Sequence, residues 1–150
     1  HSSWRADAED KKVVAKVITE MGLEEIAFKE INNLSGGQRQ KVFIARAAAQ
    51  KAELILLDEP TNNLDLKHQL EIFSLIRKEV KNGKTAIVTM HDLSLVSRYS
   101  DRIIMLKEGR VFSDGSDSSL SAAKINSVYG VEVSLKEHNG KKIIIPEKVV

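Results

Sequence analysis

Two short apolar runs, at residues 54–57 and 85–89, limit most strongly what this chain of 150 residues can fold into. The first is wholly aliphatic and bounded by polar residues, which is typical of a strand covered on both faces of a parallel sheet. The second run, Thr-Ala-Ile-Val-Thr, predicts a second strand of the buried type. Residues 66–80 between the two runs carry apolar side chains at helical spacing. This alternation of strand and helix predicts an α/β layer with a mostly parallel sheet.

Further helices and hairpins are predicted on both sides of these strands. The signals are helical spacing with capping residues and apolar runs that flank a turn containing glycine. We expect helices at residues 7–21, 38–50, 93–99 and 120–129, a helical turn at 24–28, hairpins around 108–109 and 138–140, and a polar linker at 113–119.

The composition excludes several classes of protein. Hydrophobic residues make up 42% of the chain and charged residues 29%, which predicts a globular core rather than disorder. The net charge of +2 is too balanced to indicate a nucleic-acid partner or binding to an anionic membrane surface. The chain has no cysteine and therefore no disulfide. No apolar run approaches the roughly 20 residues that cross a bilayer.

A capping motif that contains two glycines begins the helix predicted to end near residue 50. Ser35 followed by Gln38 is a capping box, which by itself predicts only a well-defined helix start. Gly36 and Gly37 are not needed for the cap, and glycine weakens a helix. They would, however, let a phosphate approach backbone N–H groups at the positive helix end. The residues alone leave a structural cap and an anion site both open.

Ionisable side chains follow both apolar runs. Asp58 and Glu59 come directly after the first run, and ligands of open α/β sheets bind beyond the carboxyl ends of strands. These two carboxylates suit a magnesium ligand and a base that activates water. His91 follows the second run and suits contact with a phosphate or a water. Taken singly, each of these residues is also consistent with a buried strand that ends at the surface.

These elements occur together in one order. Leu-Ser-Gly-Gly-Gln at residues 34–38 precedes Leu-Leu-Asp-Glu-Pro at 56–60, Asn-Leu-Asp at 63–65 and then His91. In this order the chain resembles the ABC ATPases over nearly its whole length. The resemblance implies an α/β P-loop NTPase fold in part: residues 1–50 from the helical signature subdomain, 51–112 from the catalytic core, and 113–150 as a C-terminal helix and hairpin.

The resemblance also implies residues that bind nucleotide, with ATP and Mg²⁺ as the cofactors. Ser35, Gly36 and Gly37 would bind the γ-phosphate of a nucleotide held by a second subunit, and Gln38 would begin the signature helix. The segment that ends at Asp65 would form the loop that crosses the dimer interface.

Three further residues would carry the chemistry by the same resemblance. Asp58 would hold the magnesium ion, largely through water. Glu59 would be the general base that orients the attacking water, and His91 would be the switch residue at the γ-phosphate. The activity implied for the intact subunit is ATP hydrolysis.

The phosphate-binding loop of this family is not found in the sequence. The loop requires Gly, four residues and then Gly-Lys-Ser/Thr, whereas the Gly-Lys-Thr at residues 83–85 has Lys78 at the first position and precedes a strand. Trp4 is a poor candidate for the aromatic residue that stacks on adenine. We therefore expect a C-terminal part of the domain, with a processed, truncated or engineered start at His1. Because the loop supplies most of the contacts that bind the nucleotide, this chain alone is expected to bind Mg-ATP poorly and not to hydrolyse it.

Segments 64–71, 91–93, 98–103 and 128–133 resemble the subunits that energise import of iron-siderophore, haem or cobalamin-like chelates. Without the resemblance, residues 67–71 are equally a solvated helix face. The importer type implies a head-to-tail homodimer, two transmembrane permease subunits and, indirectly, a substrate-binding protein. It places the subunit peripherally on the cytoplasmic face of the cell membrane. The transported solute depends on those other subunits.

Three other functions remain open. A soluble ABC-family ATPase that acts on ribosomes shares the Thr61-Asn62 style of loop, but its basic extensions disagree with the net charge of +2. A chromosome or DNA-repair ATPase needs long coiled coils, and no sustained heptads appear. A non-catalytic interaction module is meaningful only if the native gene also lacks the phosphate loop.

Overall fold

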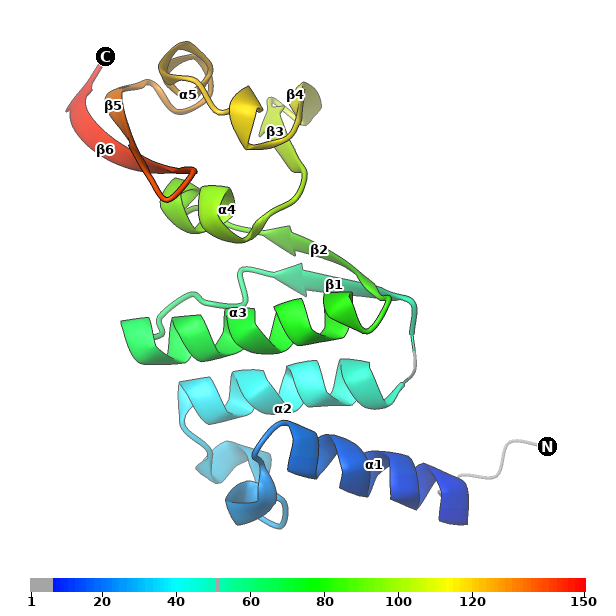
Figure 1. Cartoon of the computed structure of the whole chain (residues 1–150). Coiled ribbons are helices and arrows are strands. Elements are labelled where there is room, and N and C mark those ends of the chain that lie inside the picture. The colour runs from blue at the N-terminus through cyan, green and yellow to red at the C-terminus, as the bar shows by residue number, and fades with distance from the viewer. Residues whose placement is uncertain (1–6, 51) are drawn as a thin grey trace. The chain divides into compact units, whose positions relative to one another are not determined.

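The computed structural model describes residues 7–50 and 52–150, so that His1 and Trp4 lie outside the described residues (Figure 1). The chain forms two compact units, one ending at Thr89 and one beginning at Met90. The expected division at residues 50 and 112 stays a prediction. The first unit contains α1 (Ala8–Glu20), η1 (Glu24–Ile26), η2 (Ile31–Asn33), α2 (Gly36–Ala49), β1 (Leu54–Asp58), α3 (Leu66–Lys81) and β2 (Thr85–Thr89). The second contains α4 (Leu93–Tyr99), β3 (Ile103–Lys107), β4 (Arg110–Gly115), η3 (Asp117–Ser119), α5 (Ala122–Tyr129), β5 (Val131–His138) and β6 (Lys141–Val149).

The first unit stacks three helices on a two-stranded sheet. α1 packs on α2, α2 on α3, and α3 on β2, so that the helices and the sheet form successive layers within this unit (Figure 1). The amphipathic pattern of the helices explains the order, because each helix turns apolar side chains toward its neighbour. Ile44 of α2 and Ile72 of α3 are both 0% exposed. The apolar seam between α2 and α3 therefore holds the start of the signature helix against α3.

β1 and β2 form the predicted parallel pair, with α3 as the crossover helix. The register runs from Leu54 opposite Thr85 to Asp58 opposite Thr89. The expectation that the first strand is covered on both faces is wrong for the described chain. Ile55 is 3% exposed but Leu56 is 68% exposed, because side chains alternate along a strand and α3 covers one face only.

The Gly-Lys-Thr triplet forms a structural turn, as expected. α3 ends at the cap residue Asn82, and Gly83 takes a positive φ of 93° that suits glycine. Lys84 Nζ lies 2.7 Å from Glu79 Oε2 and donates to the Ala48 carbonyl at 3.1 Å. This lysine is thus engaged at the junction of α2, α3 and β2.

The second unit contains the two predicted hairpins, and each turns through consecutive residues of positive φ, such as Glu108 and Gly109. The polar linker expected at residues 113–119 is wrong at its start, because β4 continues to Gly115. Ser113 is buried and accepts a hydrogen bond from Lys124 Nζ at 2.9 Å. The segment was predicted as a loop because serine is typical of loops, whereas Ser113 lies buried in a strand.

Two serines of α4 accept hydrogen bonds from the edge strand β6 of the last hairpin. Ser97 is 0% exposed, and its Oγ accepts the backbone N–H of Lys142 at 2.9 Å. Ser94 Oγ accepts the N–H of Ile144 at 3.2 Å. The two hydroxyls, one turn apart on α4, satisfy N–H groups that an edge strand would otherwise present to water or to another chain.

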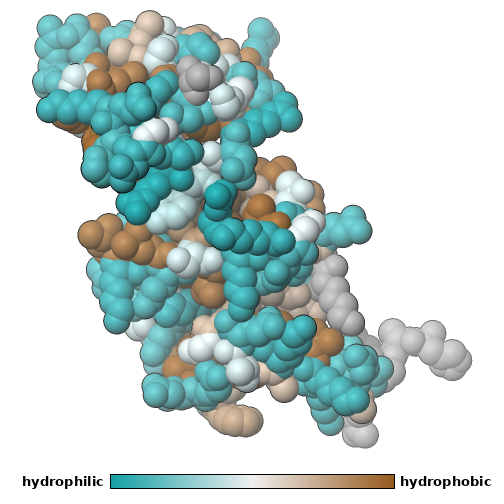
Figure 2. All heavy atoms as spheres, viewed as in Figure 1, coloured by the Kyte–Doolittle hydropathy of each residue, from teal (hydrophilic) through white to brown (hydrophobic). Residues whose placement is uncertain are grey.

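Polar side chains cover most of the face of the molecule in view, and brown hydrophobic groups are scattered among them (Figure 2). Among the described residues, no helix combines the length and the apolar character needed to span a membrane.

The Glu79–Lys84 ion pair gives the first stability prediction. Both side chains are largely buried, at 6% and 16% exposed, and removal of one partner leaves the other as an uncompensated buried charge. We expect Glu79→Ala to lower the free energy of unfolding by about 3–5 kcal/mol, measured by urea denaturation. The control is Glu9→Ala, whose ion pair with Lys12 is exposed and whose loss should cost less than about 1 kcal/mol. Equal effects of the two substitutions would contradict this interpretation.

Candidate functional site

The carboxyl ends of β1 and β2 bring three residues together. Thr89 Oγ1 donates to Asp58 Oδ1 at 2.5 Å and accepts the backbone N–H of Glu59 at 3.0 Å. The same N–H lies 3.2 Å from the Thr89 carbonyl oxygen. One threonine hydroxyl thus orients the Asp58 side chain and the Glu59 backbone together. Both contacts follow from the parallel register, which places Asp58 opposite Thr89.

Glu59 has a left-handed backbone conformation, with φ of 44°. A non-glycine residue in this region is strained, typically by 1–3 kcal/mol, and such strain often occurs at functional sites. The turn is held because the Asn62 N–H donates to the Glu59 carbonyl at 3.1 Å. Asn62 Nδ2 also donates to Glu59 Oε2 at 3.0 Å. The carboxylate of Glu59 is therefore held within the turn that leaves the strand.

Asp58 fits the magnesium role in its chemistry. Magnesium in phosphate-handling sites keeps several waters and takes only one or two carboxylates from the protein. Asp58 offers an exposed carboxylate at the strand end, with one oxygen oriented by Thr89. Among the described residues, no three His, Asp or Glu side chains gather into a metal cage. A single exposed carboxylate is therefore the kind of donor that a partly hydrated magnesium ion takes.

The loop at residues 61–65, here called the interface loop, is tied to the first turn of α3. Gln69 Nε2 donates to the Leu64 carbonyl at 3.1 Å and to the Thr61 carbonyl at 3.5 Å. Asp65 caps α3, because its Oδ1 accepts the N–H of His68 at 2.9 Å. Asn63 takes φ of 59°, a conformation that asparagine tolerates better than most residues. The loop is therefore rigidly connected to the helix that follows it.

The segment at residues 35–37, here called the signature turn, forms the predicted capping box. The Gln38 N–H donates to Ser35 Oγ at 3.3 Å, and the Ser35 N–H donates to Gln38 Oε1 at 3.1 Å. The N–H groups of Gly36 and Gly37 belong to the first turn of α2, where backbone N–H groups have no acceptor within the helix. Ser35 and Gly36 are exposed, whereas Gly37 is buried. The turn therefore presents N–H groups at a positive helix end, the arrangement that suits an anion.

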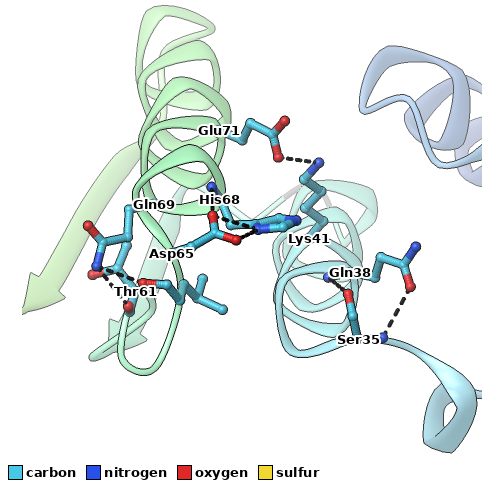
Figure 3. A network of polar contacts seen from close by, with 9 residues as sticks. Ser35, Gln38, Lys41, Thr61, Asp65, His68, Gln69 and Glu71 are labelled. Carbon is cyan, nitrogen blue, oxygen red and sulfur yellow. Dashed lines mark hydrogen bonds and ion pairs between the residues drawn. The ribbon is translucent and has the colours of Figure 1, made fainter.

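Figure 3 shows the polar contacts at the signature turn, in the interface loop and between α2 and α3. His68 Nδ1 lies 2.8 Å from Asp65 Oδ1 and 2.8 Å from Oδ2. The backbone N–H of His68, followed by its imidazole, lowers the pKa of Asp65. Lys41 Nζ lies 2.7 Å from Glu71 Oε2 and lowers the pKa of that carboxyl. Both carboxylates are consequently ionised at neutral pH.

The structure brings the predicted residues together in two groups within the first unit. Asp58 and Glu59 share the strand end, and Ser35 to Gln38 share the α2–α3 side with Asp65. His91 lies in the second unit, where it is exposed and immediately precedes Asp92, the N-cap of α4. The roles predicted for these residues stay predictions.

Sequence reasoning missed Thr89, Asn62 and His68 as site residues. Thr89 was detectable, since the two predicted strands have similar lengths and their ends align Asp58 with Thr89. His68 stands three residues after the capping Asp65, a spacing that indicates contact within one helix turn. Its position against α2 depends on packing that the sequence does not display.

The chain is similar to known proteins over almost its whole length. The ABC transporter family model matches residues 1–62. An uncharacterized ABC transporter ATP-binding protein of Methanocaldococcus jannaschii is 43% identical over 147 residues, which cover 97% of this chain and 58% of that protein. The iron(3+)-hydroxamate import ATP-binding protein of Bacillus subtilis is 46% identical over 112 residues, which cover 74% of this chain and 42% of that protein.

The fold of the chain is also similar to that of a solved ABC transporter structure. It is described as an inward-facing conformation of a transporter assigned to the metal-chelate ABC type, and it matches with a TM-score of 0.89 at 25% identity. The match covers 99% of this chain and 62% of that chain. The chain spans about half the length of the curated relatives it matches.

The Thr89 hydroxyl gives a prediction for the strand end. Thr89→Val keeps the strand shape but removes a donor to Asp58 and an acceptor for the Glu59 N–H, and we expect a loss of about 1 kcal/mol in the free energy of unfolding. Thr85→Val is the matched control at the other end of β2 and should be near neutral. Chemical denaturation of both variants measures the difference. A Thr89→Val protein as stable as the control would show that the hydroxyl does not hold the strand end.

Proposed function

Because this chain belongs to the ATP-binding domains of the ABC transporter family, we propose that it forms part of an ATP-hydrolysing subunit of an ABC importer. The solute class that fits best is an iron-siderophore or a related metal chelate. This choice is supported by the likeness to an iron(3+)-hydroxamate import protein and to a structure of metal-chelate type. The partners would be a second such subunit, arranged head to tail, and two permeases, with the subunit peripheral on the cytoplasmic face of the membrane.

The observation that carries the proposal is one threonine hydroxyl, at the carboxyl end of a parallel strand pair, that contacts the carboxylate of one acidic residue and the backbone of the next. Thr89 orients Asp58 by a hydrogen bond to its side chain and Glu59 by a hydrogen bond to its backbone. The two carboxylates are adjacent in sequence, yet the left-handed turn at Glu59 gives them different surroundings. Different surroundings allow different roles, a metal ligand and a base.

Glu59 is the proposed general base. Its carboxylate takes the proton of a water that attacks the γ-phosphate, while Asn62 holds one carboxylate oxygen at 3.0 Å. Asp58 would hold a magnesium ion, which neutralises charge on the phosphates when it is bound. His91 would contact the γ-phosphate from the start of the second unit.

The signature turn would act on a nucleotide held by the second subunit. The N–H groups of Gly36 and Gly37 and the hydroxyl of Ser35 lie at the positive end of α2, where a γ-phosphate is stabilised. The helix dipole and these donors require no rearrangement of the cap. Asp65, at the end of the interface loop, would contact the same partner across the dimer interface.

The general-base role of Glu59 is tested in an ATP-binding subunit that contains this chain. Glu59→Gln replaces the carboxylate with a neutral amide of the same size, which cannot act as a base. We expect ATP binding to persist and turnover to fall by about 10²–10⁴, measured by phosphate release. Glu53→Gln, just before β1 and exposed, is the matched control and should keep normal turnover. Unchanged turnover in Glu59→Gln would remove this residue from the role.

The expected weak binding of Mg-ATP by this chain alone is tested by a calorimetric titration, with phosphate release followed in parallel. We expect no binding in the micromolar range and no turnover, because the sequence contains no phosphate-binding loop. Micromolar binding with turnover would contradict this part of the proposal and would assign the nucleotide grip to residues of this chain.

A further inference from the structure

The His68 imidazole lies directly against Gly37. A Cβ atom built on Gly37 would stand 2.5 Å from His68 Cδ2 and 2.8 Å from Cγ, whereas ordinary van der Waals contact begins at 3.4 Å. Gly37 is buried at this contact. The ring thus fills the space that any side chain at position 37 would need, and this packing is a reason for the second glycine that does not depend on a phosphate.

The same ring is held from its other side by the interface loop. His68 Nδ1 lies 2.8 Å from both carboxylate oxygens of Asp65, which also accepts the His68 backbone N–H. The ring cannot swing away from Gly37 without losing its contact with Asp65. In Figure 3 the imidazole lies between the Asp65 carboxylate and α2, the helix that Ser35 caps.

Two further contacts hold the two helices at this distance. Lys41 and Glu71 form an ion pair of 2.7 Å, one turn farther along α2 and α3 than Gly37 and His68. At the loop end, a Cβ on Gly36 would lie 3.7 Å from Leu64 Cδ2. The interface loop therefore lies near Gly36, and His68 is the side chain that connects the loop's capping aspartate, Asp65, to Gly37.

We propose that His68 is a positioning residue that makes the signature turn and the interface loop move as one rigid body. The inference rests on the proposed function, since there both segments act on the partner subunit. A displacement of the loop at the dimer interface then shifts the N–H groups of the signature turn by a similar amount. His68 itself touches neither nucleotide nor water in this role.

The contact is tested first in this chain, without reference to activity. NMR follows the Gly37 amide, which senses the ring, and the Asp65 carboxyl carbon, whose titration senses the hydrogen bond. His68→Ala should change both signals. His68→Asn places an amide nitrogen near the position of Nδ1 and should restore only the Asp65 titration, while His68→Phe should restore only the ring effect on Gly37. Lys67→Ala, exposed on the neighbouring position, should change neither. An unchanged Gly37 signal in His68→Ala would overturn the inference.

The functional consequence is tested in an ATP-hydrolysing subunit that contains this chain. Each of the three His68 variants breaks one half of the connection or both, so each should lower kcat by about 10- to 100-fold, the usual cost of misplacing a binding group. Nucleotide affinity of the isolated subunit should not change, since His68 does not touch the phosphates. Normal kcat in all three variants would overturn the positioning role and leave the ATPase proposal intact. A wild-type subunit without ATPase activity would contradict the proposed function. The NMR experiment would still show whether His68 contacts Gly37 and Asp65.

Discussion

The parallel register of β1 and β2 is the constraint on which the strand-end site depends. Because Leu54 pairs with Thr85, the chain reaches Asp58 and Thr89 at the same level of the sheet. A shift by one residue would turn the Thr89 hydroxyl to the opposite face and separate it from the Asp58 carboxylate and the Glu59 backbone N–H. α3 connects the two strands and packs against β2, and on β1 Ile55 is buried while Leu56 is exposed.

The seam between α2 and α3 has a comparable effect on the signature turn. Glycines at a helix start are readily interpreted as space for a ligand, and Gly36, which is exposed, agrees with that interpretation. Gly37 differs, because its missing side chain makes room for an imidazole from the next helix. The two glycines of the motif thus lack a side chain for different physical reasons. Gly36 leaves space toward solvent, and Gly37 leaves space for the His68 ring.

Most of the elements were predictable from local signals. The capping box at Ser35, the turn at Gly83 and both hairpins follow from residue types at fixed spacings, and the structure has each of them. The errors arose where packing decides the outcome. Leu56 is 68% exposed although it stands in an aliphatic strand. The strand through Ser113 resembles a linker in sequence, yet its buried hydroxyl is hydrogen-bonded to a lysine distant in sequence. The contact between His68 and Gly37 has no signal in the sequence, since it depends on how two helices pack.

The parallel pairing also has a consequence for the order of folding. Leu54 and Thr85 are 31 positions apart (85 − 54), whereas the strands of each hairpin in the second unit are joined by a tight turn. Closing a long loop costs more chain entropy before any contact rewards it, and non-local pairing slows folding. The hairpins are therefore expected to form early and the strand end with Asp58 late, after α3 has formed. The residues proposed to carry the chemistry would then be among the last to reach their final positions as the chain folds.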